Sequence, residues 1–231
     1  MKRRVILSLI LLCLQAAICG QSVPREFLRG EVSVELEPVF LLNMGISSPI
    51  DVALAARWAL EDSAAAFSAM IFGWEFEYEP GERARELREN LSLTPLGAIR
   101  TDDASLRVTE AAVRENVYYL WCDYELSASQ KRRITAWNAS DTKGVQATGY
   151  APLMGADGAE SREALKRGAL EDAMKKAARA ALKLTERNRP RIVKGVIALE
   201  AFPVYRIFQG NWAALAKFRL KITEITPFPV Y

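Results

Sequence analysis

Two long alanine-rich segments of this 231-residue chain carry almost the same six residues, 110 positions apart. Residues 57–62 read RWALED and residues 167–172 read RGALED, so five of the six positions are identical. Both segments have apolar residues at helical spacing, and strand-like segments follow each of them. We therefore predict an internal duplication and an α+β fold of two related modules, each a long helix packed on a small, mainly antiparallel sheet. The modules would span residues 21–135 and 136–231.

Strands with one buried face are predicted where apolar and polar residues alternate. The clearest is 117–126, where Tyr118, Leu120, Cys122 and Tyr124 share one face. Because Cys122 points with the apolar set, we expect a buried, unreactive thiol. Further strands are predicted over 32–36, 72–78, 96–100, 106–111, 133–137, 145–151, 192–202, 204–208 and 215–225.

Two strand predictions concern position in a sheet. Segments 133–137 and 145–151 are expected to form a hairpin around a turn-rich stretch. In the last strand Lys217, Arg219 and Lys221 alternate with apolar residues. Such a basic row is typical of an edge strand protected by charge.

Helices are predicted where the apolar spacing is helical and a capping residue precedes it. The two long helices should run over about 49–70 and 162–185, with Ser48 and Ser161 as N-caps. A short charged helix is predicted over 82–91.

The first twenty residues have the layout of a secretory signal peptide. Lys2, Arg3 and Arg4 form a basic start, residues 5–14 form an apolar run, and small residues follow. The apolar run is shorter than the about 20 residues that a transmembrane helix needs. We predict a signal peptide over residues 1–20, and an exported protein in the periplasm or cell envelope of a bacterium.

Two kinds of processing fit the end of this signal peptide. Ala17 and Cys19 suit a signal peptidase that cuts before Gly20, whereas lipidation would make Cys19 the first residue of a lipoprotein. A lipidated chain would be tethered to a membrane. Cys122 is the one cysteine outside the signal region, so the mature chain has no partner for an internal disulfide.

Loss of residues 1–20 also changes the charge balance. The full chain has 31 Lys and Arg against 28 Asp and Glu, and removing Lys2, Arg3 and Arg4 leaves 28 of each sign. A neutral mature chain has no net positive field to attract phosphates, so we expect no nucleic-acid partner.

The chain contains no histidine. This excludes Ser-His-Asp and Cys-His nucleophile systems and imidazole zinc sites. The acidic pairs 61–62 and 171–172 are neighbours on a helix, where adjacent side chains point about 100° apart. They should be solvated or paired with Arg57 and Arg167 instead of converging on a substrate. We predict no catalytic residue, no cofactor and no metal site.

Tyr119 and Trp121 lie on the less apolar face of the strand at 117–126. Strand aromatics commonly fill the core or pair across strands. On this face, however, they are the best candidates for an exposed partner surface.

A sequence pattern over residues 145–173 resembles a known family. Residues 145–152 read VQATGYAP, and the helix after them carries SREA at 161–164 and ALEDA at 169–173. This pattern resembles the N-terminal module of flagellar assembly protein T and of related small secreted lipoproteins, over roughly residues 145–200. The resemblance implies an α+β module in the periplasm that binds other envelope proteins without catalysis, and it carries over no functional residue.

These observations predict an exported bacterial envelope protein that is not an enzyme. It would act as a protein-binding or assembly module, in the flagellum or in another envelope assembly. Its expected partners are envelope proteins, including flagellar basal-body components, with membrane contact only if Cys19 is lipidated. The alternative is a periplasmic ligand-binding protein or a carboxylate-dependent enzyme, which would need two acids from separate elements to converge in a pocket.

Overall fold

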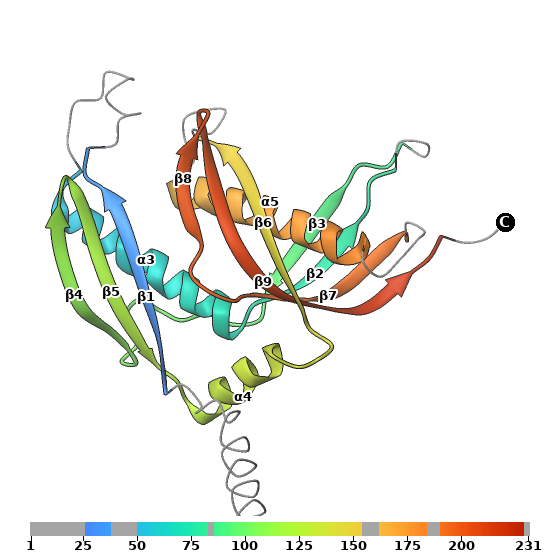
Figure 1. The fold of residues 1–231 in the computed structure, drawn as a ribbon, viewed down its shortest axis with the longest axis horizontal. Coiled ribbons are helices and arrows are strands. Elements are labelled where there is room, and N and C mark those ends of the chain that lie inside the picture. Colours follow the sequence, from blue (N-terminus) through green and yellow to red (C-terminus); the bar gives the residue numbers. More distant parts are fainter. Residues whose placement is uncertain (1–25, 38–49, 83–85, 154–161, 184–189, 229–231) are drawn as a thin grey trace, which may run out of the picture.

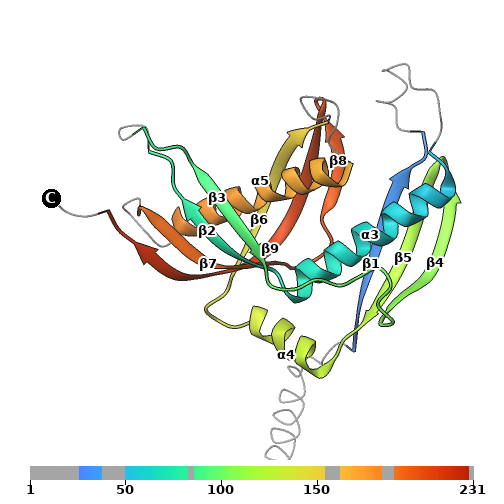
Figure 2. The same cartoon turned by 180° about the vertical axis from the view of Figure 1, so that it is seen from behind.

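The computed structural model describes residues 26–37, 50–82, 86–153, 162–183 and 190–228. Within these ranges the chain forms two antiparallel sheets, each with a long helix lying against it (Figure 1, Figure 2). The predicted α+β class is confirmed. The predicted signal peptide with Cys19, and the expected caps Ser48 and Ser161, lie outside the described residues.

The smaller sheet has three strands and packs against the first long helix, α3 (Val52–Ile71). Its core contains the predicted apolar face of residues 117–125, and Phe67 of α3 is fully buried beside Tyr124. The ring centroids of Phe67 and Tyr124 are 5.7 Å apart. In sheet order the strands are β1 (Phe27–Glu35), β5 (Val117–Glu125) and β4 (Leu106–Arg114).

The larger sheet has six strands and packs against the second long helix, α5 (Arg162–Lys183). Here a glycine in the sheet lets the helix come close. A Cβ atom placed on Gly149 would lie 2.1 Å from the Ala169 carbonyl oxygen, so the strand touches the helix backbone. In sheet order the strands are β3 (Asn90–Pro95), β2 (Trp74–Glu79), β7 (Ile192–Leu199), β9 (Asn211–Thr226) and β6 (Lys143–Pro152), with β8 (Val204–Phe208) beside β9.

The hairpin of β2 and β3 follows α3 in sequence but belongs to the larger sheet, where β2 pairs with β7. Side chains at the far end of the hairpin connect it to α5. The Tyr78 hydroxyl on β2 donates to Glu89, just before β3, at 2.5 Å, and Arg179 of α5 forms an ion pair with the same Glu89 carboxylate. Burial and this hydrogen bond raise the pKa of Tyr78 to about 12. The two sheets therefore do not divide the chain at a single point.

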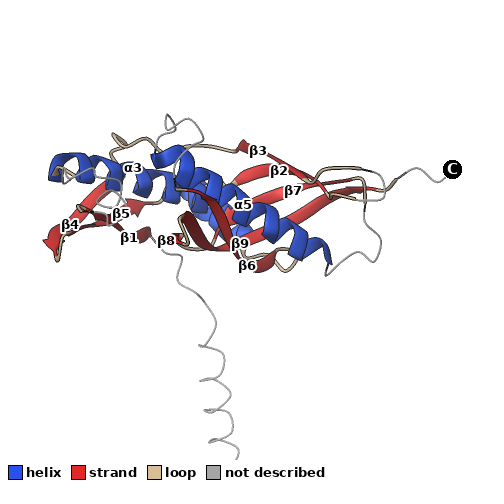
Figure 3. Ribbon diagram, turned by 90° about the horizontal axis from the view of Figure 1, so that it is seen from above, coloured by secondary structure: helices blue, strands red, loops and turns tan. Residues whose placement is uncertain are grey.

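The two copies of the repeated motif occupy equivalent places in the two helices. Residues 57–62 start at the sixth residue of α3, and residues 167–172 start at the sixth residue of α5. Ala59 and Ala169, the third residue of each copy, are both fully buried against their sheets. Figure 3 shows both helices lying across strands, so each copy sits at a helix–sheet contact.

Three local predictions are wrong, and the structure explains each. The expected strand at 133–137 belongs to a helix, α4 (Ala128–Trp137), which starts at a capping box in which Ser127 and Gln130 cap each other. The expected helix over 82–91 is absent from its described residues, since Glu82 and Leu87 form a β-bridge and β3 begins at Asn90. Residues 96–100 are not in a strand.

The final strand is not an edge strand, contrary to the prediction. β9 pairs with β6 on one side and with β7 and β8 on the other. Two of its three basic residues form ion pairs: Arg219 pairs with Glu200 at 3.0 Å, and Lys221 pairs with Asp141 at 2.5 Å.

Candidate functional site

A groove of about 850 Å³ lies between the two helix-on-sheet units. Helices α3 and α5 both line it, and so do the edge strand β1 and the start of β8. In both Figure 1 and Figure 2, β1 and β8 stand on either side of this region. Its volume falls in the range of small-molecule and peptide sites.

Most of the lining is apolar. Alanines of α3 make one wall smooth, and larger side chains of α5 and the adjoining strands complete the surface. Five of these side chains also belong to the buried core, so this surface is held by the packing behind it: Ala66, Ala69, Leu170, Met174 and Leu199. The apolar and aromatic lining residues of the helices and the larger sheet are Ala65, Ala66, Ala69, Trp74, Leu93, Pro95, Leu170, Met174, Leu199, Val204 and Tyr205.

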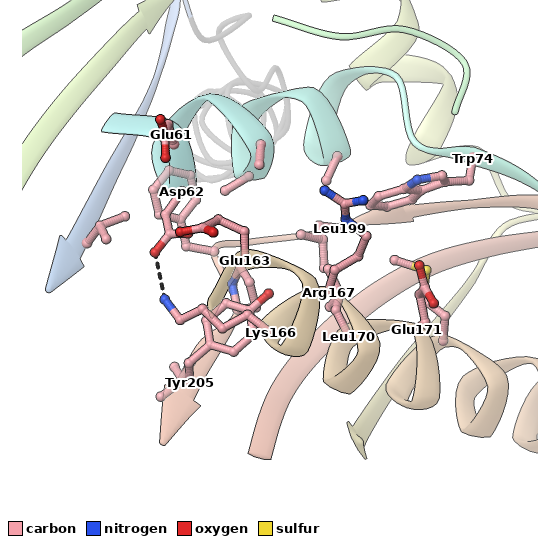
Figure 4. A pocket seen from close by; sticks show the side chains of 18 of the residues that line it. Glu61, Asp62, Trp74, Glu163, Lys166, Arg167, Leu170, Glu171, Leu199 and Tyr205 are labelled. Atoms are coloured by element: carbon pink, nitrogen blue, oxygen red, sulfur yellow. Dashed lines mark hydrogen bonds and ion pairs between the residues drawn. The ribbon is translucent and has the colours of Figure 1, made fainter. Parts of the chain in front are cut away.

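An ion pair joins the two helices at one end of the groove (Figure 4). The Lys166 ammonium on α5 donates to the Asp62 carboxylate on α3 at 2.6 Å, and Arg162 reaches the same carboxylate oxygen at 3.2 Å. Lys166 is only 5% exposed. Burial lowers the pKa of Lys166, and the neighbouring Asp62 carboxylate opposes that shift.

Two aromatic rings complete the surroundings of Lys166. Its Nζ atom lies 4.7 Å from the centroid of the Tyr205 ring and 5.5 Å from that of the Trp212 ring. A cation over aromatic faces is stabilised by the ring quadrupole. Burial raises the pKa of the Tyr205 hydroxyl. Lys166 is therefore held as a structural cation by a carboxylate and two rings.

The rim of the groove is acidic. Glu31, Glu61, Glu163 and Glu171 line it, and Arg167 is the one basic lining residue besides Lys166. Asp62 balances Lys166, and two of the other carboxylates have arginine partners outside the lining: Arg57 lies 3.9 Å from Glu61 and Arg162 lies 3.8 Å from Glu163. Glu31 and Glu171 remain without an ion pair among the described residues. We expect this surface to attract cations, most strongly at low ionic strength.

The two aspartates of the motif copies have different partners. Asp172 accepts a hydrogen bond from the Tyr150 backbone N–H at 3.0 Å and pairs with Lys176 on its own helix at 2.7 Å. Asp62 instead reaches across to α5, so the prediction of a solvated or locally paired Asp62 is wrong. The neighbouring Arg57–Glu61 pair is present, at 3.9 Å. Sequence spacing describes one helix only, and so it could not reveal the pairing between helices.

Tyr119 and Trp121, the predicted partner surface, lie on the face of β5 that points away from α3. Their rings stack with centroids 5.8 Å apart. The Trp121 indole N–H donates to Glu31 at 3.1 Å, and the Arg114 guanidinium lies 5.7 Å from the indole centroid. Both aromatics are half-buried by these neighbours. Because Glu31 also lines the groove, this surface adjoins the groove rim.

Cys122 is fully buried and unpaired, as predicted, and burial raises the pKa of its thiol. The described residues contain no cluster of three or more Cys, Asp or Glu side chains placed to hold a metal ion. None of the described helices combines the length and the apolar character needed to cross a membrane.

A family model matches residues 17–228, which is most of the chain. The chain belongs to the family that this model describes. It is also 27% identical over 167 residues to an uncharacterized protein of Treponema pallidum (strain Nichols). That alignment covers 70% of this chain, and the chain spans 65% of the relative's length. No solved structure matches this chain.

Proposed function

We propose that this protein is an exported bacterial envelope protein that acts as a non-catalytic protein-binding or assembly module. The observation that carries the proposal is the groove between the two units, with its apolar lining and acidic rim. A concave surface of this kind can take up apolar side chains of a partner and orient them through charges at its edge. The chain lacks histidine, and the buried Lys166 is occupied by Asp62.

We infer further that the two helix-on-sheet units are related modules. The order β1, α3, β2 corresponds to β6, α5, β7. In one sheet β5 pairs with β1 and β4, as β9 pairs with β6 and β8 in the other. On this interpretation β2 and β7 are equivalent strands that pair with each other, which joins the modules across a shared sheet.

The partners we propose are envelope proteins, including flagellar basal-body components. The support for export is the signal-like segment at residues 1–20, and Cys19 would add a membrane anchor if it is lipidated. The stacked pair Tyr119 and Trp121 is a second candidate contact surface beside the groove.

Photo-crosslinking in the cells that make the protein tests this proposal. A photoreactive amino acid is placed at Ala65 in the groove or at Tyr119 on the β5 surface, and at exposed Arg132 on α4 as the control. We expect adducts to one envelope protein from Ala65 or Tyr119 and none from Arg132, and basal-body proteins among the adducts would assign the flagellum. Absence of adducts from both positions would contradict the binding-module proposal.

The alternative is a periplasmic ligand-binding protein or a carboxylate-dependent enzyme. The observation in its favour is that carboxylates of two helices, Glu61 on α3 with Glu163 and Glu171 on α5, line one groove. A small molecule retained by the purified protein, together with an absence of protein adducts, would support this alternative.

Membrane attachment has a test of its own. If Cys19 is lipidated, the Cys19→Ser variant should move from the membrane fraction to the soluble fraction of the envelope. An unchanged distribution would contradict lipidation.

A further inference from the structure

The strand β1 has a free edge inside the groove. β1 pairs only with β5 among the described strands. At the two ends of this pairing the Leu126 N–H donates to the Glu26 carbonyl at 2.9 Å, and the Leu36 N–H donates to the Asn116 carbonyl at 2.8 Å. In an antiparallel pair the residues that bond to the neighbour alternate. Even-numbered residues of β1 therefore bond to β5, and odd-numbered ones point the other way.

The free edge of β1 borders the groove. Glu31, Val32 and Ser33 line it, and of these Glu31 and Ser33 have backbone N–H and C=O groups that do not bond to β5. Phe202, which also lines the groove, packs over Gly30 on the face of β1 that is turned to α3: a Cβ atom added to Gly30 would lie 2.0 Å from the Phe202 ring. The free edge that we consider for pairing runs from Glu31 to Glu35.

An unpaired strand edge recruits another strand unless something blocks it. Proline, bulges and charged side chains, lysine above all, are the usual blocks. Residues 31–35 (EVSVE) contain neither proline nor lysine, and their charges, on Glu31 and Glu35, disfavour an acidic strand and favour a basic one. The opposite wall, at Val204 and Tyr205 of β8, is itself part of a strand that pairs only with β9 among the described strands. The groove thus lies between two free strand edges.

The charge and shape of the lining define the occupant. An extended segment alternates its side chains between two sides. One set would meet the apolar lining around Ala65 and Met174, where small alanines leave room. The other set would meet the carboxylates of Glu31 and Glu171 at the rim. The best fit is a segment in which apolar side chains alternate with basic ones.

We propose that an extended segment of a protein partner, with basic residues alternating with apolar ones, adds as a strand to the free edge of β1 in this groove. This mode of recognition draws its affinity from backbone hydrogen bonds and its specificity from alternate side chains. The inference rests on the proposed function, because it names the kind of segment that the binding module recognises.

Fluorescence anisotropy with the mature chain tests the inference. The probe is a fluorescein-labelled octapeptide of four Lys-Val repeats, and the matched control replaces every lysine by glutamate. We expect the lysine peptide to bind at least 10-fold more tightly than the glutamate peptide, and its affinity to fall with added salt. Equal affinity of the two peptides would overturn the proposed charge preference and with it the inference.

Methylated probes test the strand pairing itself. In an extended peptide the N–H groups of the lysines point to one edge and those of the valines to the other. One probe is therefore N-methylated on every lysine and a second on every valine. We expect a loss of at least 10-fold with one of them or with both. Full retention of binding by both would overturn strand addition.

A protein variant supplies the complementary test. Ser33→Pro removes the backbone N–H at the centre of the free edge, and proline is tolerated on an edge strand. Ser33→Ala is the control, because it keeps that N–H. We expect at least 10-fold weaker binding of the lysine peptide by Ser33→Pro and unchanged binding by Ser33→Ala, with both variants folded by circular dichroism. If Ser33→Pro does not fold, the methylated probes decide the question with the natural chain.

The inference and the proposed function can fail separately. If no lysine peptide binds while photo-crosslinking at Tyr119 still captures an envelope protein, strand addition in the groove is wrong and the binding-module proposal stands. If the peptide binds as expected but neither crosslinking position captures a protein in cells, strand addition at this edge stands and the cellular role is wrong.

Discussion

The two helix-on-sheet units differ in how the long helix packs on its sheet. Both helices bury several alanines, and the sheets that face them differ. Helix α3 buries Phe67, whose ring lies 4.9 Å from the Phe202 ring by centroid distance, and it faces the large β5 side chains Tyr118, Leu120 and Tyr124. Helix α5 comes into backbone contact with β6 at Gly149. A helix that faces large side chains of its sheet stands off that sheet, whereas one that faces glycine lies close to it.

This difference has consequences for how the units tolerate change. Large side chains contribute much apolar burial, but they can turn when a neighbour changes. A backbone-to-backbone contact buries less surface per residue and has no side chain that can move aside. The α3 unit should therefore be most sensitive to lost volume, and the α5 unit to added volume.

The largest effect should come from removing volume at α3. Phe67→Ala leaves a cavity under β5 and should lower the free energy of unfolding by about 4 kcal/mol. Urea unfolding followed by circular dichroism measures this. The matched change in the other core, Met174→Ala, should cost less, about 3 kcal/mol. A smaller loss for Phe67→Ala than for Met174→Ala would contradict the proposed division between the units.

Substitutions that add volume should instead destabilise the α5 unit more than the α3 unit. Gly149→Ala places a Cβ atom against backbone of α5 and should destabilise by about 3 kcal/mol, whereas Gly30→Ala meets only the Phe202 ring, which can turn, and should cost about 1–2 kcal/mol. Gly144→Ala on the same strand as Gly149 is the control, because its Cβ has no neighbour closer than 3.7 Å. Thermal and urea unfolding of the three variants check the order, and similar losses at positions 144 and 149 would refute it.

The ion pair between the helices should have an intermediate effect. Asp62→Asn leaves Lys166 buried without its carboxylate and should lower stability by about 2 kcal/mol. Adding Lys166→Met should restore part of the loss, because the unpaired buried charge is then gone. A double-mutant cycle from urea unfolding measures the coupling. Additive losses would mean that the pair does not link the two units.

The smallest effect concerns the hairpin that joins the units. The folded pKa of Tyr78 is about 12, above its ordinary value of 10.0, so its contribution is complete below pH 10 and is lost as the pH rises toward 12. Between about pH 10 and 11 the natural chain should lose about 1 kcal/mol more stability than Tyr78→Phe. Urea unfolding at both pH values compares them. Parallel pH profiles would show that this hydroxyl does not anchor the hairpin to α5.

Much of the local structure follows from patterns in the sequence. The alternation in residues 117–125 predicted the buried face of β5, including Cys122, and the alanine spacing predicted both long helices to within a few residues. These patterns are local because a side chain's direction follows from the backbone period of its own segment. One local signal was missed: the Ser127–Gln130 capping box, which marks the start of α4.

The candidate site was less accessible to such reasoning. Tyr119 and Trp121 were singled out from the face they occupy, and that placement holds, but the groove beside them was not predicted. Its walls come from β1, α3, α5 and β8, which are far apart in the chain. The Asp62–Lys166 pair spans 104 positions, and no periodicity within one helix reports which helix will lie opposite.

The sequence by itself determined the two long helices and most of the strands, which of their faces are apolar, and that one motif recurs at the same place in two helices. Only the tertiary structure decided that β2 and β3 pair with β7, that Asp62 reaches Lys166, and that a free strand edge faces an acidic groove. The physical reason is that side-chain periodicity is a property of one segment. Strand partners and contacts between helices depend instead on how all segments bury their apolar faces at once.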